Sequence, residues 1–320
     1  MRIAALLLTT GLCLLSPSSA RTQGSGPSVG DDRAKDPATS LFAQSAGQAL
    51  NRDFPSDEIS FLLLDARSGA VLASRWDHPE TPIPLGSLLK PFTALAYGEL
   101  HEFKYPNHIC RGTMTGCWRP RGHGAVNLTS AIAYSCNSYF RVLTAGMTAA
   151  EVAPTANRFG LQAPAPRIFG PALAGLGSRN LGDRNFDDHN FDNHTFGNQW
   201  LVSPLNLSRA YLELVRRRDQ PGVSLILSGM AQSARQGTGA EVDRALPHSD
   251  ALAKTGTAPC THARHAPGDG FTIALAPAGE PQILLLVRVH GAPGSQAAKT
   301  AGQMLRRVEP WAAADEWPRE

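Results

Sequence analysis

The sequence predicts an α+β fold, in which a central antiparallel sheet with flanking helices is built from both ends of the chain. Runs of strand-forming residues occur early and late, at 59–64, 71–76, 251–257, 270–276 and 282–289. The segment between them, about 93–245, contains mostly helical patterns and loops and is expected to be a helical insertion. Because strands and helices do not alternate along the chain, a parallel sheet with crossover helices is not expected.

The expected elements begin with a helix over 40–51, followed by a hairpin whose turn is Asp65-Ala-Arg-Ser-Gly69. Another helix begins near Ser87, and a helix over 296–308 comes last. The best helices of the insertion are expected at 128–143 and 204–216.

The composition is that of an ordinary globular protein. Hydrophobic residues make up 42% and charged residues 18% of the 320 residues, which excludes disorder as the main state. Thirty Lys and Arg residues stand against 27 Asp and Glu residues, and the net charge of +3 is scattered along the chain. This small excess argues against a nucleic-acid-binding surface.

The first 20 residues have the pattern of a secretory signal peptide, with Arg2, an apolar run over 3–15 and small residues up to Ala20. The run is shorter than the ~20 residues that a membrane-spanning helix needs. We therefore expect cleavage after Ala20 and a periplasmic or extracellular protein, with an uncleaved anchor as the alternative.

The remaining chain is expected to form one folded domain. Residues 21–39 are rich in Gly, Ser and Pro and are expected to be a flexible linker. The domain is expected over 40–310, with a tail at 311–320.

Four cysteines remain after the expected cleavage: Cys110, Cys117, Cys136 and Cys260. Export permits disulfides, and Cys110 and Cys117 lie close together in a Gly-rich turn, so this pair is the disulfide candidate. Whether Cys136 and Cys260 form a second pair or remain free thiols stays open.

No cofactor and no metal site are expected. Cys260, His262 and His265 offer only three ligands, whereas a structural zinc site needs four. A tandem repeat over 185–194 is rich in Asp, Asn and His but matches no metal motif. It is interpreted as a solvated loop, with a metal site or a substrate-facing loop as the alternative.

Three short motifs carry the chemistry, and they follow one another as Ser87-Leu-Leu-Lys90, Ser135-Cys-Asn137 and Lys254-Thr-Gly256. Each is common by itself, but the ordered set indicates a nucleophilic serine. A serine hydroxyl is a weak nucleophile until a base takes its proton. Residues three apart share a helix face, so Lys90 can reach Ser87. Pro91 is expected to fix the helix start near Ser87.

Lys90 acts as a base only when neutral, and burial and the nearby Lys254 can both lower its pKa. Ser135 is expected to relay a proton between Lys90 and the leaving group. Asn137 is expected to bind a backbone amide of a peptide substrate.

The third motif is expected to bind the substrate. Lys254 is interpreted as the ligand of a substrate carboxylate, with lowering of the Lys90 pKa as the alternative. Thr255 and Thr257 offer hydroxyls on either side of Gly256. The backbone N–H groups of Ser87 and Thr257 are expected to form an oxyanion hole, and the strand edge can pair with an extended peptide.

The motif set resembles that of the penicillin-binding proteins and serine β-lactamases. The resemblance covers about residues 55–290 and is greatest to the transpeptidase domain of monofunctional, class B-like penicillin-binding proteins. It includes these further segments: Asp65-x-x-Ser-Gly69, Gly122-His-Gly124, Val202-Ser-Pro-Leu205 and Gly237-Thr238.

The resemblance implies a peptidoglycan D,D-transpeptidase that forms a serine acyl-enzyme with D-Ala-D-Ala stem peptides and is inhibited by β-lactams. Other cell-wall synthesis proteins are implied as partners. A D,D-carboxypeptidase would use the same residues. A β-lactamase needs a base that activates water, and Glu151, Asp187 and Glu213 lack a recognisable context for it; a carbamylated Lys90, as in class D enzymes, remains open. The third alternative is a non-catalytic β-lactam sensor or scaffold.

Overall fold

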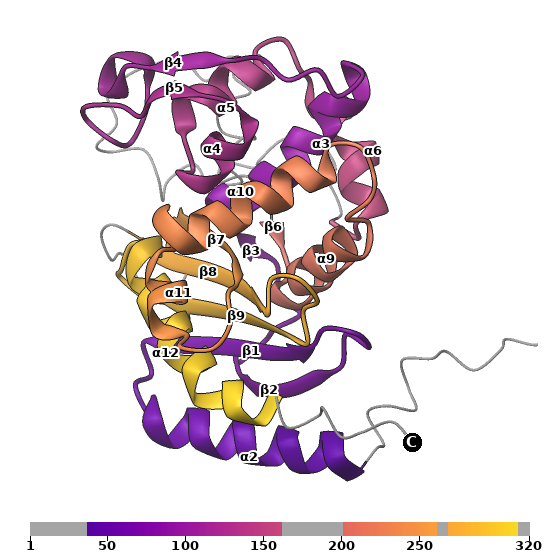
Figure 1. Cartoon of the computed structure of the whole chain (residues 1–320), viewed down its shortest axis with the longest axis vertical. Coiled ribbons are helices and arrows are strands. Elements are labelled where there is room, and N and C mark those ends of the chain that lie inside the picture. The colour runs from indigo at the N-terminus through magenta and orange to yellow at the C-terminus, as the bar shows by residue number, and fades with distance from the viewer. Residues whose placement is uncertain (1–36, 162–200, 261–267, 313–320) are drawn as a thin grey trace, which may run out of the picture.

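The computed structural model describes residues 37–161, 201–260 and 268–312 (Figure 1). The expected signal peptide, most of the linker, the 185–194 repeat and the pair His262 and His265 lie outside the described residues. Among the described residues, no helix combines the length and the apolar composition needed to cross a membrane.

The centre of the fold is a five-stranded antiparallel sheet with the strand order β2-β1-β9-β8-β7. Its strands are β1 (Ile59–Asp65), β2 (Val71–Arg75), β7 (Leu252–Ala258), β8 (Asp269–Ala276) and β9 (Ile283–Val289). The N-terminal hairpin joins the C-terminal strands through β1 and β9, whose register runs from Ile59 opposite Val289 to Asp65 opposite Ile283. The prediction of a sheet built from both chain ends is confirmed, and β7 forms one edge of this sheet.

The predicted hairpin turn is present, and hydrogen bonds within the turn stabilise it. Asp65 Oδ1 accepts hydrogen bonds from Ser68 N at 2.6 Å and Ser68 Oγ at 2.7 Å. Gly69 adopts a φ of +75°, which glycine allows without steric cost.

Helices cover both faces of the sheet (Figure 1). On one face, α2 (Pro37–Asp53), α11 (Glu241–Ala245) and α12 (Gly294–Ala312) enclose a core that includes Leu50, Leu285 and Ala301. The other face carries the larger core, which the helical insertion shares with Leu62 and Ile273. Strands β8 and β9 are buried along their whole length because both faces are covered.

The insertion lies above the sheet in Figure 1. Its helices are the 3-10 helix η1 (Gly86–Leu89), α3 (Lys90–Leu100), the 3-10 helix η2 (Gly112–Thr115), α4 (Leu128–Ala133), α5 (Asn137–Thr144), α6 (Ala149–Arg158), α9 (Pro204–Arg216) and α10 (Val223–Gln236). Short strands pair within it as β3 (Ile83–Pro84) with β6 (Leu201–Val202), and β4 (His108–Cys110) with β5 (Gly124–Val126).

Two helix predictions in this region were wrong in detail. The expected helix over 128–143 is split into α4 and α5, because Ser135 adopts a φ of +50° that a helix does not allow. The α-helix expected to begin near Ser87 begins at Lys90 instead, after a 3-10 turn, and Pro91 lies in its first turn.

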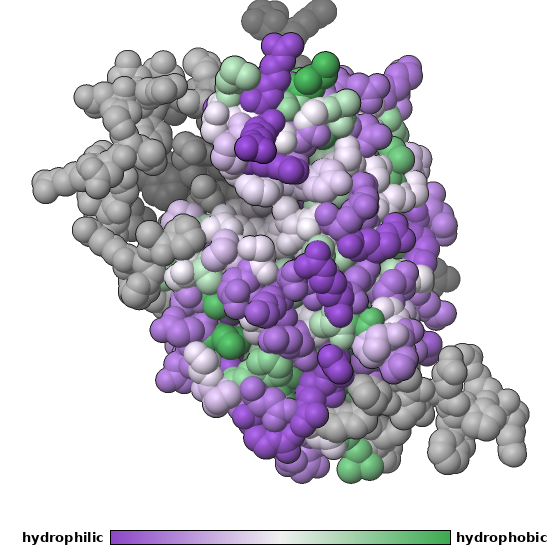
Figure 2. All heavy atoms as spheres, turned by 60° about the vertical axis from the view of Figure 1, so that its left-hand side comes forward, coloured by the Kyte–Doolittle hydropathy of each residue, from purple (hydrophilic) through white to green (hydrophobic). Residues whose placement is uncertain are grey.

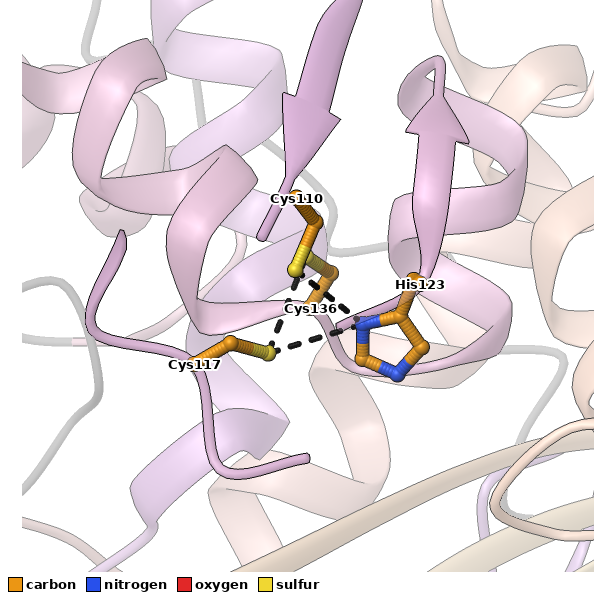
Figure 3. Close-up of side chains that lie close together, drawn as sticks. All are labelled: Cys110, Cys117, His123 and Cys136. Carbon is orange, nitrogen blue, oxygen red and sulfur yellow. Dashed lines mark hydrogen bonds between the residues drawn. The ribbon is translucent and has the colours of Figure 1, made fainter. Parts of the chain in front are cut away.

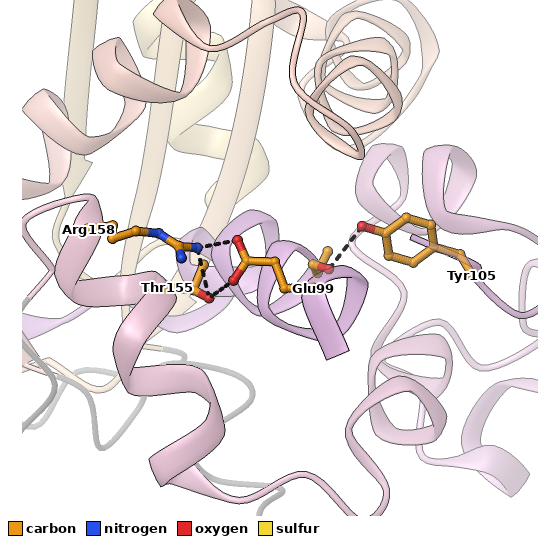
Figure 4. A network of polar contacts seen from close by, with 5 residues as sticks. Glu99, Tyr105, Thr155 and Arg158 are labelled. Atoms are coloured by element: carbon orange, nitrogen blue, oxygen red, sulfur yellow. Dashed lines mark hydrogen bonds and ion pairs between the residues drawn. The ribbon is translucent and has the colours of Figure 1, made fainter. Parts of the chain in front are cut away.

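A polar network fixes α3 at its C-terminal end (Figure 4). Glu99 accepts a hydrogen bond from Thr155 Oγ1 at 2.7 Å and forms an ion pair with Arg158, both on α6. Tyr105 donates to the carbonyl of Ala94 at 3.1 Å. The helix that begins with Lys90 is therefore anchored to its neighbours at the far end.

Hydrophilic residues predominate on the face shown in Figure 2, and hydrophobic ones are scattered among them.

Candidate functional site

Ser87 lies where the turn η1 meets the edge strand β7. Gly86, directly before it, has a φ of +52°, and a Cβ there would lie 2.3 Å from the carbonyl oxygen of Thr257. At Gly256, a Cβ would lie 3.0 Å from the carbonyl oxygen of Leu85. These two glycines let the turn approach the strand, so the half-buried Ser87 stands beside the exposed Thr257.

Replacing Gly86 with alanine is expected to separate η1 from β7 and to slow by about 10²-fold the acylation that the sequence predicts for Ser87, since small misplacements of reacting groups have effects of that size. Gly146→Ala is the matched control, because Gly146 also has a positive φ, +89°, but no atom within 4 Å of the added Cβ. The control should lose about 1–2 kcal/mol of stability and keep its acylation rate. Penicillin-labelling rates and thermal melts of both variants test this, and equal rates would contradict the close-approach argument.

Lys90 lies beneath the break between α4 and α5. Its side chain is fully buried, and its Nζ donates hydrogen bonds to Ser135 O at 2.8 Å and Asn137 Oδ1 at 2.7 Å. Ser135 Oγ lies 3.4 Å from the same nitrogen. The positive φ of Ser135 turns the chain so that these three oxygens face Lys90.

Lys254 reaches the same hydroxyl from the sheet. It lies within β7, is fully buried, and donates from Nζ to Ser135 Oγ at 3.0 Å and to Thr255 O at 2.8 Å. Ser135 Oγ therefore lies between two lysine nitrogens.

Burial changes the protonation of both lysines. It lowers the pKa of Lys90 to about 7, because the charged form loses its hydration in the core. Burial and then the charge of Lys90 lower the pKa of Lys254 well below its ordinary value. Near neutral pH, a large fraction of Lys90 is thus the free amine that can accept a proton.

The threonines of β7 contact other parts of the chain. Thr255 Oγ1 donates to Thr238 Oγ1 at 2.6 Å, and the backbone N–H of Gly294 donates to Thr257 Oγ1 at 3.0 Å. Thr238 is half-buried and is tied to α4, because its N–H donates to Ala133 O at 3.1 Å. The sequence had indicated Thr238 only as part of a family-like segment, and the structure adds it to the site.

The predicted site residues therefore divide into two groups. One hydrogen-bonded group contains Lys90, Ser135, Asn137 and Lys254. Ser87 lies one 3-10 turn before Lys90, and the hydroxyls of Thr255 and Thr257 have separate partners.

Two of the carboxylates considered as a water-activating base, Glu151 and Glu213, lie in the described part of the chain, and each is held by a contact on its own helix. Glu151 caps α6 and accepts from Thr148 N at 2.6 Å. Glu213 pairs with Arg217 on α9 at 2.6 Å. Asp187 lies outside the described residues.

The disulfide prediction was wrong: Cys110 and Cys117 are free thiols. They converge with Cys136 and His123, and Cys117 Sγ lies 3.9 Å from Cys136 Sγ (Figure 3). The spacing argument missed this, because the break between α4 and α5 brings a third sulfur to the pair. Cys260 is also free, with Sγ 3.9 Å from His290 Nδ1.

A protein-family profile matches most of this chain. The sequence profile of the penicillin-binding protein transpeptidase domain matches residues 59–308. No curated protein matches the chain.

Solved structures share the fold at low sequence identity. PBP2 of Pseudomonas aeruginosa has a TM-score of 0.66 and 19% identity, over 87% of this chain and 75% of that one. The transpeptidase domain of penicillin-binding protein 3 from Burkholderia pseudomallei has a TM-score of 0.64 and 18% identity, over 88% and 95%. PBP2 of Helicobacter pylori, solved in complex with MreC, has a TM-score of 0.66 and 16% identity, over 86% and 63%.

Proposed function

Since the chain belongs to the penicillin-binding protein transpeptidase family, we propose that it is a serine D,D-transpeptidase that cross-links peptidoglycan. Its substrates are stem peptides that end in D-Ala-D-Ala, and β-lactams are its inhibitors. The observation that carries this proposal is the hydrogen-bonded group of Lys90, Ser135 and Lys254, in which two buried amines converge on one hydroxyl.

Acylation begins when the neutral amine of Lys90 accepts the proton of Ser87 Oγ. The oxygen attacks the carbonyl of the penultimate D-Ala, and the backbone N–H groups of Ser87 and Thr257 stabilise the oxyanion. Ser135 passes the proton from Lys90 to the nitrogen of the departing D-alanine. An amine of a second stem peptide then attacks the ester, releases Ser87 and forms the cross-link.

Strand β7 positions the donor peptide. It is an edge strand, so an extended peptide can extend the sheet through main-chain hydrogen bonds. The half-buried Thr238, whose Oγ1 accepts a hydrogen bond from Thr255 Oγ1, offers a hydroxyl for the terminal carboxylate. Asn137 binds Lys90 through Oδ1, which leaves its amide N–H₂ to donate to a substrate carbonyl.

The contacts of Lys254 support a role in orienting Ser135 and not in binding the substrate carboxylate. Its Nζ is fully buried and bonded to Ser135 Oγ and Thr255 O, whereas a carboxylate ligand must face the substrate. We therefore assign Lys254 to orienting Ser135 through the hydrogen bond that Lys254 Nζ donates to Ser135 Oγ.

We also propose that the chain is exported and that it interacts with other cell-wall synthesis proteins. Residues 1–20 have the pattern of a signal peptide, and peptidoglycan lies outside the cytoplasm. The complex of Helicobacter pylori PBP2 with MreC supports an interaction of this chain with other cell-wall synthesis proteins.

Timed mass spectrometry with benzylpenicillin tests the proposal against a β-lactamase. A transpeptidase should carry one penicilloyl adduct on Ser87 that persists for hours, because neither Glu151 nor Glu213 is placed to activate water. Rapid loss of the adduct with hydrolysed penicillin would identify a β-lactamase, and absence of any adduct would identify a scaffold.

A further inference from the structure

We propose that Cys110, Cys117, His123 and Cys136 bind one Zn²⁺ ion as a structural site next to the Ser135–Asn137 segment (Figure 3). Each residue offers one ligand atom, and the four atoms lie within 4.8 Å of one another. This inference goes beyond the proposed function and does not depend on it.

The distances between the ligand atoms fit a tetrahedron around zinc. Zn–S bonds of about 2.3 Å and Zn–N bonds of about 2.0–2.1 Å place tetrahedral S···S pairs about 3.8 Å apart and S···N pairs about 3.6 Å apart. Cys117 Sγ and Cys136 Sγ are 3.9 Å apart. His123 Nδ1 lies 3.6 Å from Cys110 Sγ and 3.5 Å from Cys117 Sγ.

The donor set selects the metal. Three cysteine sulfurs and one imidazole form a closed Cys₃His set, which is typical of structural zinc, whereas Mg²⁺ and Ca²⁺ prefer oxygen ligands. The three cysteines are at most 5% exposed, so water is largely excluded from the site. On binding, each thiol loses its proton to solvent as its sulfur forms a bond to Zn²⁺, and no oxidant is needed.

The ligands come from separate segments that a metal ion would hold together. Cys110 ends β4, Cys117 follows η2, and His123 directly precedes β5. The His123 ring stacks on Tyr134, with centroids 5.4 Å apart and an angle of 13° between the planes, which fixes its orientation.

Cys136 links this cluster to the candidate active site. It is the residue before α5 and stands between Ser135 and Asn137, both of which face Lys90. A metal bond to Cys136 would hold the backbone that places Ser135 at its positive φ. We assign the zinc a positioning role, in which its loss lowers stability and disturbs the site without removing a reacting group.

The first experiment uses the wild-type chain purified under reducing conditions. Elemental analysis should find one zinc per chain. Replacement by Co²⁺ should give the intense thiolate-to-cobalt absorption near the ultraviolet and the visible bands of a tetrahedral site. A fully reduced wild-type protein that binds neither metal would overturn the proposal, as would a mass 2 Da lower that shows a disulfide within the cluster.

Matched variants locate the ion. Cys117→Ser should weaken zinc affinity at least 10-fold and lower the melting temperature of the zinc-loaded protein. Cys260→Ser removes a cysteine outside the cluster and should keep one zinc and the cobalt spectrum. Loss of the metal from Cys260→Ser, or its full retention in Cys117→Ser, would place the site elsewhere.

Discussion

Replacing Ser87 with alanine is expected to lower the rate of acylation by a penicillin by about 10⁴-fold or more, because the variant lacks the oxygen that forms the ester. Ser135 is not expected to replace Ser87, because its Oγ lies between Lys90 Nζ and Lys254 Nζ, where we propose that it carries the proton. Labelling with a fluorescent penicillin and peptide mapping measure the effect. An adduct on Ser135, or undiminished labelling, would contradict the assignment of the nucleophile.

The control for this variant is Ser208→Ala. Ser208 is fully buried on α9 and donates to Pro204 O at 2.9 Å, far along the chain from the motifs. It should keep full labelling. Ser87→Ala should retain the melting behaviour of the wild type, since Ser87 is only half-buried and loses a single hydroxyl.

The second large effect is expected on the pH dependence of acylation. Burial lowers the pKa of Lys90 to about 7, and only the neutral amine accepts the serine proton. The acylation rate of the wild type should therefore be low below pH 7 and rise with pH through this value. In Lys254→Met the hydrogen bond to Ser135 Oγ is lost, whereas the burial that lowers the pKa of Lys90 remains, so the rate should fall at every pH and still rise through the same pH region.

The Lys254→Met variant should therefore be acylated more slowly than the wild type both below and above pH 7, and raising the penicillin concentration should not restore the rate. Lys299→Met, a change on α12, should leave the profile unchanged. If the rate of Lys254→Met stayed low at every pH but rose with penicillin concentration, Lys254 would be the carboxylate ligand that the sequence had suggested.

The strands of the sheet and the three motifs could be recognised in the sequence because both depend on local patterns. Strands 59–65 and 283–289 contain the apolar runs 61–64 and 283–287, and Ser87 and Lys90 have helical spacing. The three motifs that predict a nucleophilic serine lie within the residues that the family profile matches.

The rest depends on contacts between distant segments. The φ of Ser135 divides an otherwise regular helical pattern, and no residue in the motif signals it. The same break brings Cys136 to Cys117, so sequence spacing favoured a disulfide where three sulfurs and an imidazole meet. Thr238 reaches Thr255 only because Gly237 lies against α4, where a Cβ would be 2.3 Å from Ala133 O.

The most direct test of the central claim is the reaction of the purified chain with a stem pentapeptide ending in D-Ala-D-Ala and an amine acceptor. We expect D-alanine and cross-linked peptide in equal amounts, and neither product from Ser87→Ala. D-alanine without cross-linked peptide would show a carboxypeptidase. No D-alanine and no acyl-enzyme from the wild-type chain would contradict catalysis by Ser87 altogether.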